Sequence, residues 1–386
     1  AEYYDLQATF DKLYSESKNG KTFTKIMPII LSENNIRLAY RNLKRNSGSR
    51  TAGTDHQTIK DLETWKEPDL VRYVRKRLEW YIPQPVRRVE IAKDNGKTRP
   101  LGIPTIQDRL IQQCFLQVLE PICEAKFHDR SFGFRPNRSQ ENAVAVAYSL
   151  MQIQHLHFVV DLDIKGFFDN VSHGKLLRQM WALGIRDKTV LSILSAMLKA
   201  EVAGIGFPEK GTPQGGIISP LLSNIVLNEL DWWISSQWET MPMRKNYVRT
   251  RKDNGVAEKT YAYKVLREKS RLKECYGLRY ADDFRIFCRR RQDAEKLFIA
   301  TQKWLKERLG LDISPEKSQI VNLKRKYSEF LGFKMMVKPN GKMGNKTRYT
   351  VVSHISEKRK GKIKKRASEL VAKIKFPADK LKSINS

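Results

Sequence analysis

The sequence predicts an α+β protein in which strands pair through hairpins rather than through regular βαβ units. Three observations support this class. Residues 86–93 alternate apolar and basic side chains up to an Asn-Gly turn at 94–97, and 98–104 returns as an extended segment. Residues 157–171 open as a buried strand, and 105–126 carry one apolar stripe at helical spacing.

The charge balance indicates a polyanionic partner. The chain has 386 residues, enough for two or three domains, and 40% of them are apolar, so most of it is expected to fold. It carries 72 Lys and Arg against 42 Asp and Glu, a net charge of +30. Nucleic acid is the first candidate for the partner, and the alternative is a protein that is merely soluble and basic.

The cysteines and the apolar runs exclude several classes. Cys114, Cys123, Cys275 and Cys288 form no CxxC pair and no zinc spacing. We therefore expect them to be reduced and mostly buried in a cytosolic protein. No apolar run approaches the roughly 18 residues of a membrane span, and no signal peptide is visible, so no membrane partner is expected.

Helices dominate the expected structure of the first third of the chain. Residues 31–46 are predicted to form a short basic helix with Ser32 as its N-cap. A flexible basic loop at 47–55 precedes one or more helices within 57–80, which end at the YIPQP sequence. Ser139 is the expected N-cap of a helix that follows the SFGFRPNRS loop.

Later segments mix loops, helices and a strand. The glycine-rich GTPQGG loop leads into a helix with Ser219 as N-cap and Pro220 at its first position. Residues 240–274 are long, polar and basic and are interpreted as an insertion. The remaining expected elements are an amphipathic helix over 292–309, a strand over 329–337 and a basic amphipathic helix over 358–382 with Ala367, Leu370, Val371 and Ile374 on one stripe.

Two adjacent acids in LRYADDFRIF pose the central question. Asp282 and Asp283 lie between two apolar runs, and such pairs are common in solvated hairpin turns. The other interpretation is a metal-binding corner of a polymerase active site. That site needs a further carboxylate, because nucleotidyl transfer uses two divalent ions about 3.5–4 Å apart, and magnesium prefers carboxylate oxygens.

The VVDLDI segment supplies candidates for this carboxylate. Residues two apart share one face of a strand, so Asp161 and Asp163 point away from Val160, Leu162 and Ile164. Two acids on one face of an apolar strand are costly unless they are paired or bound to a metal. The alternative is a pair of salt bridges at a strand end.

Phe168 favours Asp163 over Asp161 as the metal-binding acid. It lies five residues after Asp163, whereas Gly166 lies five residues after Asp161. A bulky aromatic just after the metal-bound acid would collide with the 2′-hydroxyl of a ribonucleotide. Asp163 and Phe168 together therefore make a coherent dNTP site, and Asp161 becomes a supporting or core partner.

Two further segments suit a nucleotide site. Glycines in PQGG allow a close backbone approach, and Gln214 adds a hydrogen-bonding side chain, although the segment fits an ordinary turn before a helix equally well. Lys93 and Arg99 flank the Asn-Gly turn, where two cations could clamp a triphosphate. Taken alone, that hairpin fits a solvated basic surface better.

The order of these features resembles a group II intron reverse transcriptase, also called an intron-encoded maturase. An RNA-templated RNA polymerase more often carries GDD and a polar residue in place of Phe168. The resemblance covers about residues 31–337. It rests on seven ordered blocks, PVRRVEIAKDNGKTRPLGIPTIQDRLIQQ, FHDRSFGFRPNRS, VDLDIKGFFDNVSH, GTPQGGIISPLLSNIVLNELD, LRYADD, LGLDISPEKSQI and FLGF.

The resemblance implies a role for each matching residue. It implies that two Mg²⁺ ions are bound by Asp163, Asp282, Asp283 and the backbone carbonyl of Ile164. The implied nucleotide contacts are Lys93, Arg99, Phe168 as the sugar gate, Gln214 and Gly215. The implied template or RNA contacts are Arg45, Arg50, Arg135 and Arg138, and Lys317 is a candidate for the acid that protonates pyrophosphate.

The implied fold is that of a right-hand polymerase, with fingers, a palm whose antiparallel sheet is flanked by helices, and the start of a helical thumb. The implied domains are an N-terminal extension with a template-covering loop (1–56), fingers (57–156), palm (157–338, including the 240–274 insertion) and a linker with the start of the thumb (339–386). A complete thumb cannot fit, so a fragment is expected. The insertion is longer than family members lead us to expect, and is either an RNA-gripping arm or a dimer contact.

The implied function is an RNA-directed DNA polymerase that copies RNA into cDNA and also binds its parent intron RNA, in a cytoplasmic, bacterial-type ribonucleoprotein. Its partners are then an RNA template, a primer, dNTPs and the intron RNA, with a homodimer as a further arrangement. Two alternatives stay open. One is an RNA-binding splicing cofactor without polymerase activity of its own, and the other is a retron, diversity-generating or CRISPR-linked reverse transcriptase.

Overall fold

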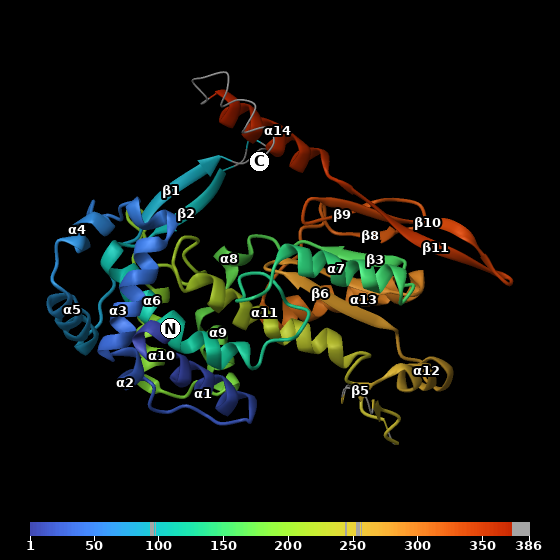
Figure 1. Cartoon of the computed structure of the whole chain (residues 1–386), viewed down its shortest axis with the longest axis horizontal. Helices are drawn as coiled ribbons and strands as arrows, with labels where there is room; N and C mark the ends of the chain where they lie inside the picture. The colour runs from blue at the N-terminus through green and yellow to red at the C-terminus, as the bar shows by residue number, and fades with distance from the viewer. Residues whose placement is uncertain (93–95, 97, 244, 252–254, 256, 373–386) are drawn as a thin grey trace.

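The computed structural model combines a group of helices with a sheet-centred region, and a long hairpin extends from the latter (Figure 1). None of the helices formed by the described part of the chain is both long and apolar enough to cross a membrane. The structure describes residues 1–92, 96, 98–243, 245–251, 255 and 257–372.

The N-terminal helices pack around α6 (Ile106–Glu124), which is buried along most of its length. Its neighbours α1 and α3 contact it directly. The segments before it are η1 (Glu2–Tyr4), α1 (Gln7–Lys18), α2 (Met27–Ile30), α3 (Glu33–Arg45), η2 (Ser47–Arg50), α4 (Ile59–Glu63) and α5 (Glu67–Glu79). Helix α3 confirms the predicted helix over 31–46, and α4 and α5 confirm the helices within 57–80. Helix α6 confirms the apolar stripe over 105–126. Ser32 is the N-cap of α3, but its hydroxyl donates to the carbonyl of Ile29 rather than capping the helix.

The predicted basic hairpin is present. Strands β1 (Arg87–Ala92) and β2 (Thr98–Ile103) pair antiparallel, with Ile91 opposite Arg99. Lys93, Asp94, Asn95 and Lys97 lie outside the described residues, and so does the side chain of Arg99.

A four-stranded antiparallel sheet forms the centre of the second region. Its strand order is β6-β7-β3-β8, from β3 (Phe158–Leu162), β6 (Cys275–Tyr280), β7 (Asp283–Cys288) and β8 (Gln319–Asn322). Helices α7 (Gln140–Gln152) and α11 (Ser219–Ser236) contact β6. Helix α13 (Arg291–Trp304), continued by η3 (Leu305–Leu309), contacts β3 and β7. The sheet is therefore covered by helices, which explains why most residues of β7 are buried.

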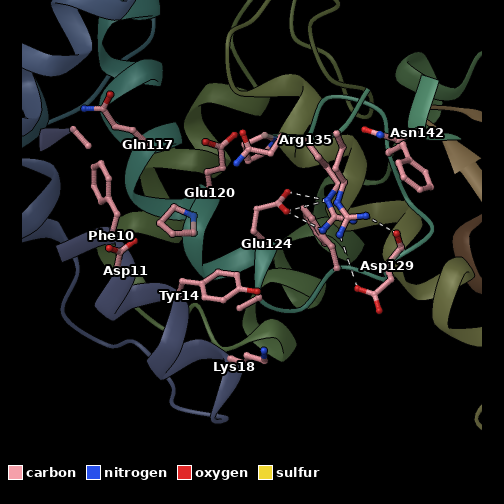
Figure 2. Close-up of a pocket in the computed structure, with 18 of the residues that line it drawn as sticks. Phe10, Asp11, Tyr14, Lys18, Gln117, Glu120, Glu124, Asp129, Arg135 and Asn142 are labelled. Atoms are coloured by element: carbon pink, nitrogen blue, oxygen red, sulfur yellow. Dashed lines mark hydrogen bonds and ion pairs between the residues drawn. The ribbon is translucent and has the colours of Figure 1, made fainter. Parts of the chain in front are cut away.

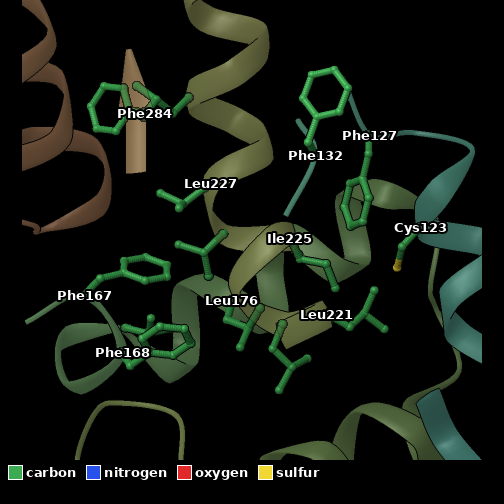
Figure 3. Packing of buried hydrophobic residues seen from close by; sticks show 14 of the residues in the cluster. Cys123, Phe127, Phe132, Phe167, Phe168, Leu176, Leu221, Ile225, Leu227 and Phe284 are labelled. Atoms are coloured by element: carbon green, nitrogen blue, oxygen red, sulfur yellow. The ribbon is translucent and has the colours of Figure 1, made fainter. Parts of the chain in front are cut away.

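Three helices follow β3, and the second of them contacts both the third helix and α11. They are α8 (Phe167–Asn170), α9 (His173–Leu183) and α10 (Lys188–Leu198). Apolar side chains from α8, α9, α11 and β7 gather in the core there (Figure 3). The predicted capping by Ser139 is confirmed, because its hydroxyl accepts the amide of Asn142 at the start of α7.

The start of α11 differs by one residue from the prediction. Ser219 is the first helical residue, and Ile218 takes the N-cap position. The Ser219 hydroxyl donates to the carbonyl of Pro213 at 2.8 Å. It therefore holds the GTPQGG loop closed instead of capping the helix.

The predicted strand over 329–337 is two strands. Strand β9 (Ser328–Phe330) turns back into β10 (Phe333–Met343) through Leu331 and Gly332, whose φ angles are 51° and 80°. Phe330 and Phe333 pair across this turn. Two successive positive φ angles are the signature of a tight hairpin turn, which the apolar periodicity of the segment conceals.

Strand β10 pairs with β11 (Lys346–Ile355) in a long hairpin, so the predicted palm boundary at 338 falls inside a strand. Helix α14 (Glu357–Ala372) follows and has no buried residue. It confirms a helix in the first part of the predicted 358–382 segment, whereas 373–386 lies outside the described residues.

The 240–274 segment contains β4 (Arg249–Thr250), β5 (Ala257–Glu258) and α12 (Thr260–Lys269). Helix α12 buries Ala262 and Leu266.

All four cysteines are buried and free, as predicted.

Candidate active site

The two adjacent acids lie at a tight hairpin turn between β6 and β7. Tyr280 pairs with Asp283, so Ala281 and Asp282 form the two-residue turn. Ala281 has a φ of 58°, which is unusual for a residue other than glycine. Asp282 is therefore at the tip, and Asp283 begins the strand.

A neighbouring loop holds this turn in place. A Cβ atom on Gly133 would lie 2.2 Å from the backbone nitrogen of Ala281, so only glycine fits there. The buried guanidinium of Arg279 donates to the carbonyl of Ala281 at 2.8 Å and pairs with Asp231 at 2.7 Å. Our sequence reasoning missed both residues, although a glycine between two phenylalanines in a loop is a usable signal.

Asp163 follows directly after β3, at the same end of the sheet. Leu162 pairs with Phe284, so Asp163 is the next residue beyond that pair on one strand and Asp283 on the other. The carbonyl of Asp163 accepts the amide of Ser314 at 2.7 Å. The ammonium of Lys317 lies 3.1 Å from the Asp163 carboxylate. The predicted acid is thus fixed at its backbone and paired at its side chain.

The carboxylates influence one another electrostatically. Burial raises the pKa of Asp283 to about 6, and the negative charges of Asp161, Asp282 and Asp163 act in the same direction. The Arg285 guanidinium opposes this rise. The Asp283 side chain is nonetheless 41% exposed, so water and ions reach it.

The structure brings the three predicted acids to one edge of the sheet without assembling a complete metal cage. Across the portion of the chain that is described, no three His, Cys, Asp or Glu side chains lie close enough together to hold a metal ion. The ion pair of Lys317 with Asp163 opposes metal binding, because the ammonium at this carboxylate repels a second cation. Metal binding therefore requires side-chain rearrangement at this edge.

Asp161 has a partner of its own. Its carboxylate lies 3.3 Å from the guanidinium of Arg285, which stands opposite it on β7. Asp161 is 17% exposed at its side chain, against 43% for Asp163. This placement agrees with Asp161 as a supporting partner and leaves Asp163 as the more accessible acid.

Phe168 is the second residue of α8, the short helix that follows Asp163, and the residue is 8% exposed. Its ring packs edge-on against Phe167, with 5.3 Å between centroids (Figure 3). The carbonyl of Phe168 accepts the amide of Thr212 at 2.8 Å. The predicted sugar gate is thus joined to the GTPQGG loop.

The close backbone approach expected at PQGG is made to the basic hairpin. A Cβ atom on Gly215 would lie 2.3 Å from the carbonyl oxygen of Gly102 in β2. A cavity of about 290 Å³ lies between hairpin and loop. Its lining includes Arg88, Pro100, Asp169, Lys210 and Gln214. The hairpin, the Phe168 segment and the loop each contribute to this lining, but of the predicted nucleotide contacts only Gln214 is part of it.

A family model described as reverse transcriptase (RNA-dependent DNA polymerase) matches residues 91–335. The chain belongs to the reverse transcriptase family. This membership confirms the predicted polymerase class of fold with fingers and palm. The mixture of helices with antiparallel sheets in the structure is consistent with it.

Several relatives of this family member are named as intron proteins. The group II intron-encoded protein LtrA of Lactococcus lactis subsp. cremoris is 31% identical over 91% of the chain and 61% of its own length. Protein YkfC of Escherichia coli K12 is 34% identical over 67% of the chain and 68% of its own length. The putative COX1/OXI3 intron 2 protein of Saccharomyces cerevisiae is 28% identical over 84% and 40%.

These similarities confirm the predicted resemblance to group II intron reverse transcriptases and maturases. The chain spans about three-fifths of the length of the LtrA proteins that it matches.

One predicted RNA contact of the reverse transcriptase does not fit its position. Arg135 is buried, and its guanidinium binds the Glu124 carboxylate at 2.8 Å and the carbonyls of His128 and Ser131 at 2.7 Å each (Figure 2). A cation engaged in this way has little capacity left for a phosphate. In this structure Arg135 braces the loop that carries Gly133, and its contact with RNA stays a prediction that these contacts do not support.

The other predicted RNA contacts are more accessible. Arg45 and Arg50, at the ends of α3 and η2, are exposed. Arg138 is 26% exposed at its side chain and lies over the Phe132 ring, and it donates to the carbonyl of Asp129.

A further hollow of the chain has none of the three acids in its lining. It has a volume of about 1240 Å³ between α1, α6, α7 and the loop of Arg135. Figure 2 shows Glu120 and Glu124 of α6 in its wall. Burial, together with the charge of Glu124, raises the pKa of Glu120 to about 7.

Proposed function

We propose that this chain is the RNA-directed DNA polymerase of a group II intron. It extends a primer 3′-hydroxyl along an RNA template with dNTPs and releases pyrophosphate. The observation that carries the proposal is the meeting of Asp163, Asp282 and Asp283 at one edge of the sheet of a reverse transcriptase domain. These acids come from two adjacent strand ends, as a two-metal site requires.

The donor set fits magnesium, because carboxylate and carbonyl oxygens are its preferred ligands. When bound, two Mg²⁺ ions supply activation of the 3′-hydroxyl and neutralisation of the leaving pyrophosphate. Asp163, Asp282 and Asp283 hold them, with the carbonyl of Ile164. The carbonyl of Asp163 already accepts the Ser314 amide, which leaves the next carbonyl along the chain for the metal.

The nucleotide is proposed to lie between the basic hairpin, the Phe168 turn and the GTPQGG loop. Gln214 and Gly215 line it from the loop, and Lys93 and Arg99 hold its triphosphate. Phe168 is proposed to act as the sugar gate, although its side chain is buried in this structure. Support comes from the hydrogen bond that joins the Phe168 turn to the loop and from the cavity between loop and hairpin.

RNA is the proposed macromolecular partner, as template and as parent intron RNA in a cytoplasmic ribonucleoprotein. The net charge of +30 and the exposed Arg45 and Arg50 support it. Residues 1–56 are proposed to cover the template, 57–156 to form the fingers, and α14 to begin the thumb. Phosphate-dominated binding predicts an affinity that falls steeply as salt increases.

The test is primer extension on an RNA template in magnesium, with dNTPs or rNTPs supplied in parallel. The wild type is expected to make DNA with dNTPs only. Asp282→Asn is expected to abolish synthesis while RNA binding stays near normal, because one metal ligand is lost and the surface charge barely changes. Asp69→Asn, an exposed acid on α5, is the matched control. Wild-type synthesis by Asp282→Asn would sink the assignment.

The same assay addresses the second candidate function, an RNA-binding splicing cofactor. The similarity to intron-encoded proteins and the positive charge favour it. Tight, salt-sensitive RNA binding by a wild-type chain that makes no product would select this alternative. Binding and synthesis in the same chain would support both roles.

A further inference from the structure

Arg285 is a buried cation that lies next to Asp161 and Asp283 at the carboxylate edge. Its side chain is 5% exposed and stands two residues after Asp283 on β7, on the same face of the strand. Its guanidinium lies 3.3 Å from Asp161 and 3.7 Å from Asp283. Phe284 and Ile286, its neighbours in sequence, are buried apolar residues.

The two terminal nitrogens of the same guanidinium also bind β9. It donates to the hydroxyl of Ser328 and to the carbonyl of Glu329, and it lies 4.6 Å from the centre of the Phe330 ring. Arg285 therefore joins three strands, β3, β7 and β9. Strand β9 leads directly into the long β10–β11 hairpin.

Burying an arginine at this position destabilises the fold unless its ion pairs and hydrogen bonds compensate for the lost hydration. Burying a charge carries a desolvation penalty of several kcal/mol that ion pairing only partly offsets. A valine or isoleucine would suit the strand better if packing were the only requirement. Nε of Arg285 finds no hydrogen-bond partner among the described residues, and it is the atom that faces Asp283.

We propose that Arg285 is a positioning residue that fixes the Asp283 carboxylate and ties the metal-binding edge to β9. Its fork holds Asp161 and the β9 acceptors, so that Nε presents one constant direction to Asp283. This inference rests on the proposed function, because the proposed function makes Asp283 a metal ligand. It makes the metal edge sensitive to any displacement of β9 and of the hairpin that follows it.

A simpler role is charge balance, in which any cation at this position serves. Arg285→Lys separates the two roles, because lysine keeps the charge and loses the planar fork. Residues that orient metal ligands cost about 10- to 100-fold in metal affinity or activity when they are replaced. Charge balance predicts no such loss for lysine.

The experiment measures Mn²⁺ affinity by electron paramagnetic resonance without primer or nucleotide, and then kcat and KM in primer extension. Arg285→Lys is expected to weaken Mn²⁺ binding and lower kcat, each roughly tenfold, with KM for dNTP nearly unchanged. Arg289→Lys is the matched control, since Arg289 pairs with Glu274 away from the carboxylate edge. The melting temperature of each variant shows whether it folds.

Ser328→Ala provides a second variant if Arg285→Lys does not fold. It removes one acceptor of the guanidinium and leaves every charge in place, so a smaller loss in the same direction is expected. Wild-type Mn²⁺ affinity and kcat in the folded variant would overturn the proposal, as would a wild-type chain that binds no Mn²⁺. Because Mn²⁺ binding is measured without substrates, an inactive wild type that still binds Mn²⁺ contradicts only the proposed function.

Discussion

The ammonium of Lys317 lies 3.1 Å from the carboxylate of Asp163, although the two residues are 154 positions apart in the chain. Asp163 follows directly after β3, and Lys317 lies in the turn just before β8, the neighbour of β3 in the sheet. Both side chains are about half exposed, at 43% and 59%. The cation therefore occupies a proposed metal ligand and can leave it at little cost, because exposed ion pairs contribute little.

Lys317→Met is expected to lower the Mg²⁺ concentration at half-maximal rate, because the competing cation is gone. If Lys317 also protonates pyrophosphate, kcat falls in the same variant. Both quantities come from primer-extension rates measured across a magnesium series. Lys306→Met is the control, since Lys306 pairs with Asp312 on the surface. An unchanged magnesium dependence would contradict the competition.

Phe168→Val is expected to increase rNTP incorporation relative to dNTP, because a smaller side chain leaves room for the 2′-hydroxyl. The ratio of kcat/KM for a matched dNTP and rNTP measures this. Phe167→Val is the control, because Phe167 is also buried in the same cluster. Both variants are expected to lose a few kcal/mol of stability through the cavity they create. Discrimination that falls equally in both would place the gate elsewhere.

Gly133→Ala is expected to lower polymerase activity strongly. The new methyl group meets the backbone nitrogen of Ala281 at 2.2 Å, so the turn that carries Asp282 must move. Gly174→Ala is the matched control, because nothing lies within 4 Å of its Cβ position. Activity is compared at equal folded fraction, determined by circular dichroism. Full activity of a folded Gly133→Ala chain would show that the turn tolerates displacement.

Glu120→Gln is expected to stabilise the protein above pH 7. The pKa of Glu120 is raised to about 7 in the folded chain, mainly by burial, so the folded state binds its proton more tightly than the unfolded state does. Stability from this group is present at low pH and is lost as pH rises through about 7.

The stabilisation at pH 8 is expected to be roughly 1–2 kcal/mol, and to vanish near pH 4. Urea unfolding at both pH values measures it. Glu79→Gln, on an exposed position of α5, serves as the control. An equal effect at both pH values would show that Glu120 does not titrate as proposed.

Local sequence patterns predicted most of the elements of the fold. Apolar periodicity found α6 and β3, and the Asn-Gly signal found the β1–β2 hairpin. Patterns also nominated Asp163, Asp282 and Asp283, because acids on or beside apolar strands stand out against the cost of burying charge. The turn between β9 and β10 was not predicted, because the apolar run continues through it and only the backbone angles of Leu331 and Gly332 reveal it.

The sequence by itself determined many of the strands and helices and which acids are available for metal, since both follow from neighbouring residues. The tertiary structure alone decided the use of each cation. Arg135 binds Glu124 and nearby carbonyls, Arg285 contacts three strands, and Lys317 forms an ion pair with Asp163. The reason is physical. Whether a charge is buried, paired or free depends on partners that folding brings together from distant parts of the chain.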